Sequence, residues 1–70
     1  MQKYDTKDLK TGVIYLRFGQ MLRYVGTYGE NLYRFEIVNI IDGNYVCNDE
    51  YFLLSEEQLI FDEATNADSN

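Results

Sequence analysis

Apolar and polar residues alternate at nearly every second position between residues 12 and 54, and glycine, aspartate or asparagine interrupts this pattern at short intervals. Successive side chains of a β-strand point to opposite faces of the sheet, so a period of two is typical of strands that cover a core on one side. No stretch of ten residues in this region keeps a helical period. The sequence therefore predicts an all-β protein.

The turn signals divide this region into short extended segments. Asp42-Gly43 is the strongest of them, because this dipeptide favours a tight two-residue hairpin. A further turn is expected at Asn48-Asp49-Glu50. The expected strands span residues 13–18, 21–28, 33–41, 44–48 and 51–54.

The aromatic side chains supply much of the expected core, since the chain has seven tyrosines and four phenylalanines. Pairing Tyr28 with Tyr33 places Tyr24 opposite Ile37 and Gly26 opposite Phe35. Asn39 then interrupts the alternation and is interpreted as a bulge. The expected core face of this hairpin consists of Leu22, Tyr24, Gly26, Tyr28, Tyr33, Phe35 and Ile37. In the first strand, the inward residues are expected to be Ile14, Leu16 and Phe18.

The C-terminal part combines a helical turn with an acidic tail. Ser55-Glu56-Glu57-Gln58 has the form of a capping box, in which the two end side chains satisfy backbone groups of one helical turn. Residues 59–61 can then return to extended structure. We expect one domain over residues 1–61 and a disordered acidic tail over residues 62–70.

The strings LKTGVIYL, RYVG, FEIVNIIDGNYV and LLSEEQLIF cover roughly residues 9–61 and together resemble an SH3-like small β-barrel. This resemblance implies a five-stranded barrel with one short helical turn before the last strand. The pattern is also similar to small accessory proteins of bacteriophages and mobile elements, many of which use this fold. Because the chain has no tryptophan and no proline, the resemblance does not extend to proline-rich peptide recognition.

Residue types that carry catalysis are scarce. The chain has no histidine, Cys47 has no basic neighbour in the sequence, and capping explains Ser55. Cys47 is expected to be a buried or half-buried apolar residue. No cysteine–histidine cluster exists, and the segment from Asp42 to Glu50 lacks the ligand spacing of an EF-hand. We expect neither an enzyme nor a cofactor or metal.

A cytoplasmic location is expected, because a lone cysteine excludes an internal disulfide and no segment has the apolar run of a signal peptide or of a membrane span.

Charge is divided unevenly along the chain. Residues 1–34 hold six bases and three acids, whereas residues 35–70 hold nine acids and no base. An acidic surface suits a protein partner with a basic surface. The expected acidic site consists of Asp49, Glu50, Glu56, Glu57, Asp62 and Glu63.

By analogy with phage proteins, such a chain would be a non-catalytic inhibitor of a host nucleic-acid-processing or defence enzyme, of the anti-restriction or anti-CRISPR type. A second candidate surface combines arginines with a ring and consists of Tyr15, Arg17, Arg23 and Arg34. It leaves open an oligonucleotide-binding barrel, although the acidic half would repel phosphate. Two further roles remain open: a homodimer in which an edge strand pairs with a second copy, and a structural subunit of a larger assembly. A third alternative is that these charged side chains are simply solvated and bind no partner.

Overall fold

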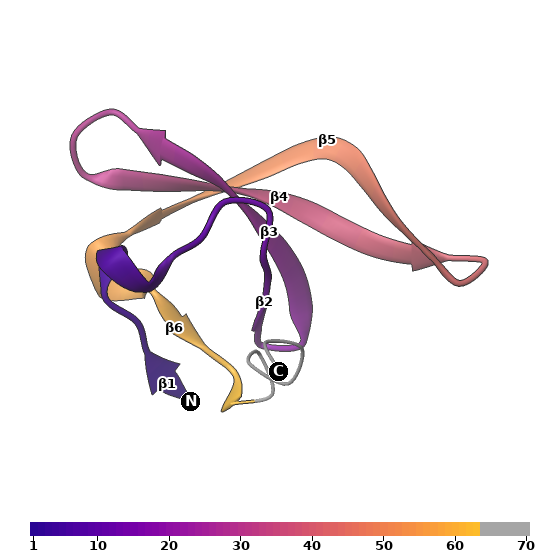
Figure 1. Ribbon diagram of the computed structural model, residues 1–70, viewed down its shortest axis with the longest axis horizontal. Coiled ribbons are helices and arrows are strands. Elements are labelled where there is room, and N and C mark those ends of the chain that lie inside the picture. The colour runs from indigo at the N-terminus through magenta and orange to yellow at the C-terminus, as the bar shows by residue number, and fades with distance from the viewer. Residues whose placement is uncertain (64–70) are drawn as a thin grey trace.

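The computed structural model describes residues 1–63, and its regular elements are strands joined by turns and two short 3-10 helices (Figure 1). The all-β prediction is therefore confirmed. The elements in chain order are β1 (Gln2–Lys3), η1 (Thr6–Asp8), β2 (Ile14–Arg17), β3 (Gln20–Tyr28), β4 (Leu32–Ile41), β5 (Asn44–Ser55), η2 (Glu56–Gln58) and β6 (Ile60–Phe61). None of the helices in the described part of the chain is long and apolar enough to cross a membrane.

The strands form two antiparallel sheets, so the closed five-stranded barrel that the sequence predicts is not shown. β2, β3, β4 and β5 form one sheet in chain order, and β1 pairs with β6 in a second, two-stranded sheet. The backbone hydrogen bond from Tyr4 N to Leu59 O at 2.8 Å extends the pairing of the small sheet, and the one from Asp62 N to Leu16 O at 2.8 Å ties it to β2. A two-residue strand such as β1 is too short to show a period, and this is why the sequence does not reveal it.

The pairing of β3 with β4 differs from the predicted register. Tyr28 pairs with Leu32 and Tyr24 pairs with Phe35, and the register shifts between Tyr24 and Gly26. A bulge at this point inserts one extra residue, Val25, into β3. The predicted pairing assumes an uninterrupted ladder. As a consequence Tyr28 is exposed instead of buried.

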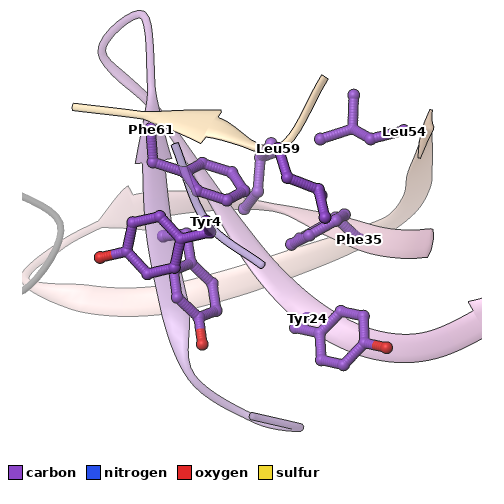
Figure 2. Close-up of a cluster of buried hydrophobic side chains, with 8 residues drawn as sticks. Tyr4, Tyr24, Phe35, Leu54, Leu59 and Phe61 are labelled. Atoms are coloured by element: carbon purple, nitrogen blue, oxygen red, sulfur yellow. The ribbon is translucent and has the colours of Figure 1, made fainter. Parts of the chain in front are cut away.

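The core lies between the inner face of the four-stranded sheet and the chain segments around β1 and β6 (Figure 2). Three of its six ring pairs meet edge to face and three are tilted. Among the first, the centroids of Tyr4 and Phe61 are 5.2 Å apart at an interplanar angle of 81°, and those of Tyr4 and Tyr15 are 5.6 Å apart. Such pairs add about 0.5–1.5 kcal/mol each to the burial of their surface. The core consists of Tyr4, Tyr15, Leu22, Tyr24, Phe35, Leu54, Leu59 and Phe61.

Tyr15 corrects the predicted orientation of the first strand. It is 2% exposed, whereas Phe18, which was expected to point inward, is 71% exposed. The Tyr15 hydroxyl accepts a hydrogen bond from Lys10 N at 2.9 Å and donates one to Asp8 O at 3.4 Å. A buried tyrosine needs such partners for its hydroxyl, and the segment around η1 supplies them. Alternation alone cannot tell which face of a strand is covered.

β5 runs through Asn48-Asp49-Glu50, where the sequence predicts a turn, so this prediction is wrong. The pairing changes from Glu36 with Tyr51 to Val38 with Cys47, so these three residues lie opposite a single residue of β4. Asp49 adopts a positive φ of 60° there. The extra residues bend β5 without ending it, and the bend is visible in Figure 1.

The hairpin between β4 and β5 confirms the predicted turn. Asp42 and Gly43 both have positive φ, at 53° and 81°, as a type I′ turn requires. Asn39 pairs regularly with Val46, so the irregularity falls between Glu36 and Val38 and not at Asn39. We call the part of this hairpin from residue 39 to residue 46 the arm.

Candidate binding surface

The four-stranded sheet has a second face, opposite the core, which we call the outer face. Side chains alternate along each strand, so residues that flank Phe35 in sequence, Arg34 and Glu36, point to this face together with their partners on β5, Leu53 and Tyr51. Glu36 and Val38 are buried on this face, but much of the rest of it is open to solvent. Its principal exposed or half-buried side chains are Tyr28, Arg34, Ile40, Tyr45, Tyr51 and Leu53.

A stack of two tyrosines and one arginine occupies one end of the outer face. The guanidinium carbon of Arg34 lies 4.3 Å from the ring centroid of Tyr51 and 5.7 Å from that of Tyr28. Both rings are exposed, Tyr28 by 51% and Tyr51 by 42%. Cation–π contact holds the arginine in place, while no residue between 1 and 63 accepts a hydrogen bond from it. Its N–H groups are therefore available to an outside acceptor.

Next to this stack, Arg23 and Glu36 form an ion pair across β3 and β4. Glu36 is only 8% exposed and is the one charged residue in the buried part of the described chain. The hydrogen bond from Arg23 holds the pKa of the Glu36 carboxyl below its usual value, and contacts with Cys47 and Arg34 act in the same direction. The same pair raises the pKa of Arg23. The exposed Cys47 thiol thus belongs to the edge of this polar site, contrary to the predicted burial.

The predicted arginine-and-tyrosine surface is only partly assembled. Arg23 and Arg34 share the outer face, whereas Tyr15 lies in the core. Arg17 has the same strand parity as Tyr15, and its Nε donates to Gln58 O at 3.3 Å. Its guanidinium also lies over the ring of Phe18. Arg17 therefore ties β2 to η2 and does not join the other two arginines.

Sequence reasoning missed both rings of the actual stack. It assigned Tyr28 to the core because it overlooked the bulge in β3, and it treated Tyr51 only as part of a strand. The usable signal was parity: Tyr51 lies one position before Phe52, which packs against the core. Had the two strands been paired correctly, Tyr51 would have appeared beside Arg34.

The predicted acidic residues occupy separate places and do not form one cluster. Asp49 and Glu50 lie in the bend of β5, while Glu56 and Glu57 begin η2. The extended residues between Glu50 and Glu56 separate these groups by roughly 15–20 Å. Figure 1 shows the bend of β5 and the turn before β6 well apart. The backbone N–H of Glu57 and the Ser55 hydroxyl lower the pKa of the Glu57 carboxyl.

Asp62 has a structural role that the sequence did not indicate. Its carboxylate accepts hydrogen bonds from the backbone N–H groups of Phe18 at 3.1 Å and Gly19 at 2.8 Å, and so holds the β2–β3 turn. Glu63 is exposed. Of the predicted disordered tail, residues 64–70 lie outside the described residues.

The capping box of η2 forms as predicted in one respect: the backbone N–H of Ser55 donates to Gln58 Oε1 at 2.9 Å. Within residues 1–63, no three His, Cys, Asp or Glu side chains gather closely enough to hold a metal ion.

No protein-family model, curated protein or solved structure matches this chain. The outer face is therefore judged on its own chemistry.

Proposed function

We propose that this protein is a non-catalytic binding module that contacts a partner protein through its outer face. The observation that carries the proposal is the exposed stack of Tyr28, Arg34 and Tyr51 on a paired sheet. Tyrosine and arginine are enriched among the residues that contribute most to protein–protein binding, because they combine large apolar area with directed hydrogen bonding.

The stack is also arranged before any partner arrives. Arg34 is held between two rings, so binding costs less side-chain entropy than it would for a free arginine. The neighbouring Glu36 already has Arg23 as its counter-ion. This leaves the N–H groups of the Arg34 guanidinium to donate hydrogen bonds to a carboxylate or carbonyl oxygen of the partner.

The charge of the chain favours a partner with a basic surface elsewhere in the contact. Residues 35–70 hold nine acids and no base, and Asp49, Glu50, Glu56 and Glu57 are all exposed. Long-range attraction of this kind raises the rate of association more than the final affinity. An inhibitor that covers the basic groove of a nucleic-acid-processing or defence enzyme fits this combination, and we propose that partner class.

A capture experiment tests the protein-binding role. The tagged full chain, its Arg34→Ala and Tyr51→Ala variants, and the control Phe18→Ala are exposed to a bacterial lysate, and bound proteins are quantified by mass spectrometry. Phe18 is an exposed ring at the β2–β3 turn, so its loss controls for general stickiness. We expect a stoichiometric protein with the wild type and Phe18→Ala and its loss with the two stack variants. Equal recovery by all four proteins, or none, would contradict the proposal.

A second candidate function rests on the same stack, because arginine beside exposed tyrosines is also the arrangement on which single-stranded bases stack. Fluorescence anisotropy with a labelled 12-nucleotide single-stranded DNA and the corresponding RNA decides between the two. Binding that weakens with salt and with Arg34→Ala would favour the nucleic acid. We expect no binding even at low salt, since the net charge of −6 repels phosphate.

A further inference from the structure

The arm is a two-stranded ribbon that extends past the rest of the sheet. β3 reaches only as far as the pair between Met21 and Val38, so residues 39–41 of β4 pair with β5 alone. Figure 1 shows this end of the β4–β5 hairpin reaching away from the other strands. Nothing in the described chain covers it.

The arm carries apolar side chains on both of its faces. Ile40 and its cross-strand partner Tyr45 lie on the outer face and are 57% and 62% exposed, and Ile41, on the opposite face, is 50% exposed. A two-stranded hairpin with uncovered side chains is at best marginally stable in water, and a third strand on its edge stabilises it. The arm is thus incomplete as a folded unit.

The free edge of β5 is the place for such a strand. β5 is the last strand of the four-stranded sheet and, within residues 1–63, pairs only with β4. Its second edge therefore presents unpaired backbone N–H and C=O groups from Asn44 onward. Exposed edges of this kind add an extended segment of another chain through backbone hydrogen bonds.

Charge identifies the occupant. Residues 38–50 contain Asp42, Asp49 and Glu50 and no base, and all three acids are exposed. A second copy would bring two such sets together and repel itself, as acidic side chains on an edge commonly do. An extended segment rich in lysine or arginine gains attraction at the same positions.

We infer that the arm binds an extended, basic segment of a partner protein, which adds as a strand along the free edge of β5 while its apolar side chains pack beside Tyr45. This inference rests on the proposed protein-binding function and adds the partner's local chemistry. Alternating lysine and valine in the segment would place charge and apolar contacts on opposite faces.

The test uses the uniformly ¹⁵N-labelled full chain and two fluorescent 12-residue peptides of identical composition. One alternates lysine with valine, and the other holds the same lysines and valines in two blocks. A third peptide replaces each lysine of the first by glutamate. We expect the alternating lysine peptide to bind at least about tenfold more tightly than either control, with amide shifts concentrated at residues 44–50. The variant Asp49→Asn/Glu50→Gln should reduce this binding, and so should Tyr45→Ser, each with an unchanged unfolding midpoint.

Equal binding of the alternating and blocked peptides, or shifts spread over the whole acidic surface, would overturn the inference. Concentration-dependent dimerisation in sedimentation equilibrium that Tyr45→Ser abolishes would overturn it in favour of a second copy. The captured lysate protein separates this inference from the proposed function: capture that requires Tyr51 but is indifferent to Tyr45→Ser and to the two acid substitutions leaves the binding module intact and removes the role of the arm.

Discussion

Both faces of the four-stranded sheet carry tyrosines, but these are buried on the inner face and exposed on the outer face. On the inner face Tyr15 is 2% exposed, and its hydroxyl is held by backbone groups of the segment around η1. On the outer face Tyr51 is 42% exposed, and its ring supports Arg34. What separates them is the cover: β1, β6 and the turns beside them lie over one face only.

This difference teaches that a ring in a strand becomes core or surface according to what lies over it. The covering strands β1 and β6 have two residues each, yet Leu59 and Phe61, from the segment that includes β6, are fully buried. Two short strands and the turns beside them therefore determine which face of the much larger sheet is buried. The comparison can be tested from its strongest expected effect to its weakest.

Phe35→Ala should have the largest effect on stability. Phe35 is completely buried and contacts the rings of Tyr24 and Phe61. Its truncation should lower the free energy of unfolding by about 3–5 kcal/mol, enough to unfold much of a small domain. Urea denaturation followed by circular dichroism measures this, with the exposed Phe18→Ala as matched control, expected within about 0.5 kcal/mol of the wild type. Comparable losses of stability in both variants would disprove the assignment of Phe35 to the core and of Phe18 to the surface.

Arg23→Ala should have the next largest effect, because it leaves the Glu36 carboxylate nearly buried without its partner. We expect a loss of about 1–3 kcal/mol, since part of the arginine is solvent-exposed and water can replace it. The double variant Arg23→Met/Glu36→Met should recover much of this loss in the same urea titration. A double variant less stable than Arg23→Ala would show that the pair itself is needed.

The stability of the wild type should also depend on pH through Glu36. Because the folded-state pKa of this carboxyl is lowered, its contribution is fully present above the ordinary glutamate pKa, near about 4.3, and is lost as the pH falls through the folded value. The difference in unfolding free energy between wild type and Glu36→Gln should thus be constant from pH 7 to 5 and shrink at lower pH. A difference that grows on acidification would contradict the assigned direction.

Asp62→Ala tests one tie between the cover and the sheet. The substitution removes the acceptor for the N–H groups of Phe18 and Gly19, which should cost about 1 kcal/mol because the carboxylate is only half-buried. Glu63→Ala is the neighbouring control, and no change is expected there. Thermal unfolding at neutral pH compares the two. If Glu63→Ala lost as much stability, the loss in Asp62→Ala could not be assigned to these two hydrogen bonds.

Arg34→Ala should have the smallest effect on stability, at most about 1 kcal/mol, because a cation–π contact at an exposed site contributes little to folding. The same substitution should abolish partner capture. This contrast is what distinguishes a binding face from a core face. A loss of stability as large as that of Phe35→Ala would assign the stack to the folding of the protein.

The sequence alone determined the features that depend on near neighbours. The period of two predicted strands, Asp42-Gly43 predicted the hairpin turn, and Leu22, Tyr24 and Phe35 were correctly assigned to the core. Each of these follows from local backbone preference or from one pair of adjacent strands. The candidate site did not follow in the same way, since only Arg23 and Arg34 of its predicted arginine-and-tyrosine set share the outer face.

Only the tertiary structure decided which face of each strand is covered. The bulge at Val25, the bend at Asp49 and the pairing of β1 with β6 each change the neighbours of residues far along the chain. Alternation defines two faces but does not show which one is buried, because both carry tyrosine and aliphatic side chains. Contacts between distant segments therefore placed Tyr15 inside and Tyr51 outside, and with them the surface on which the proposed function depends.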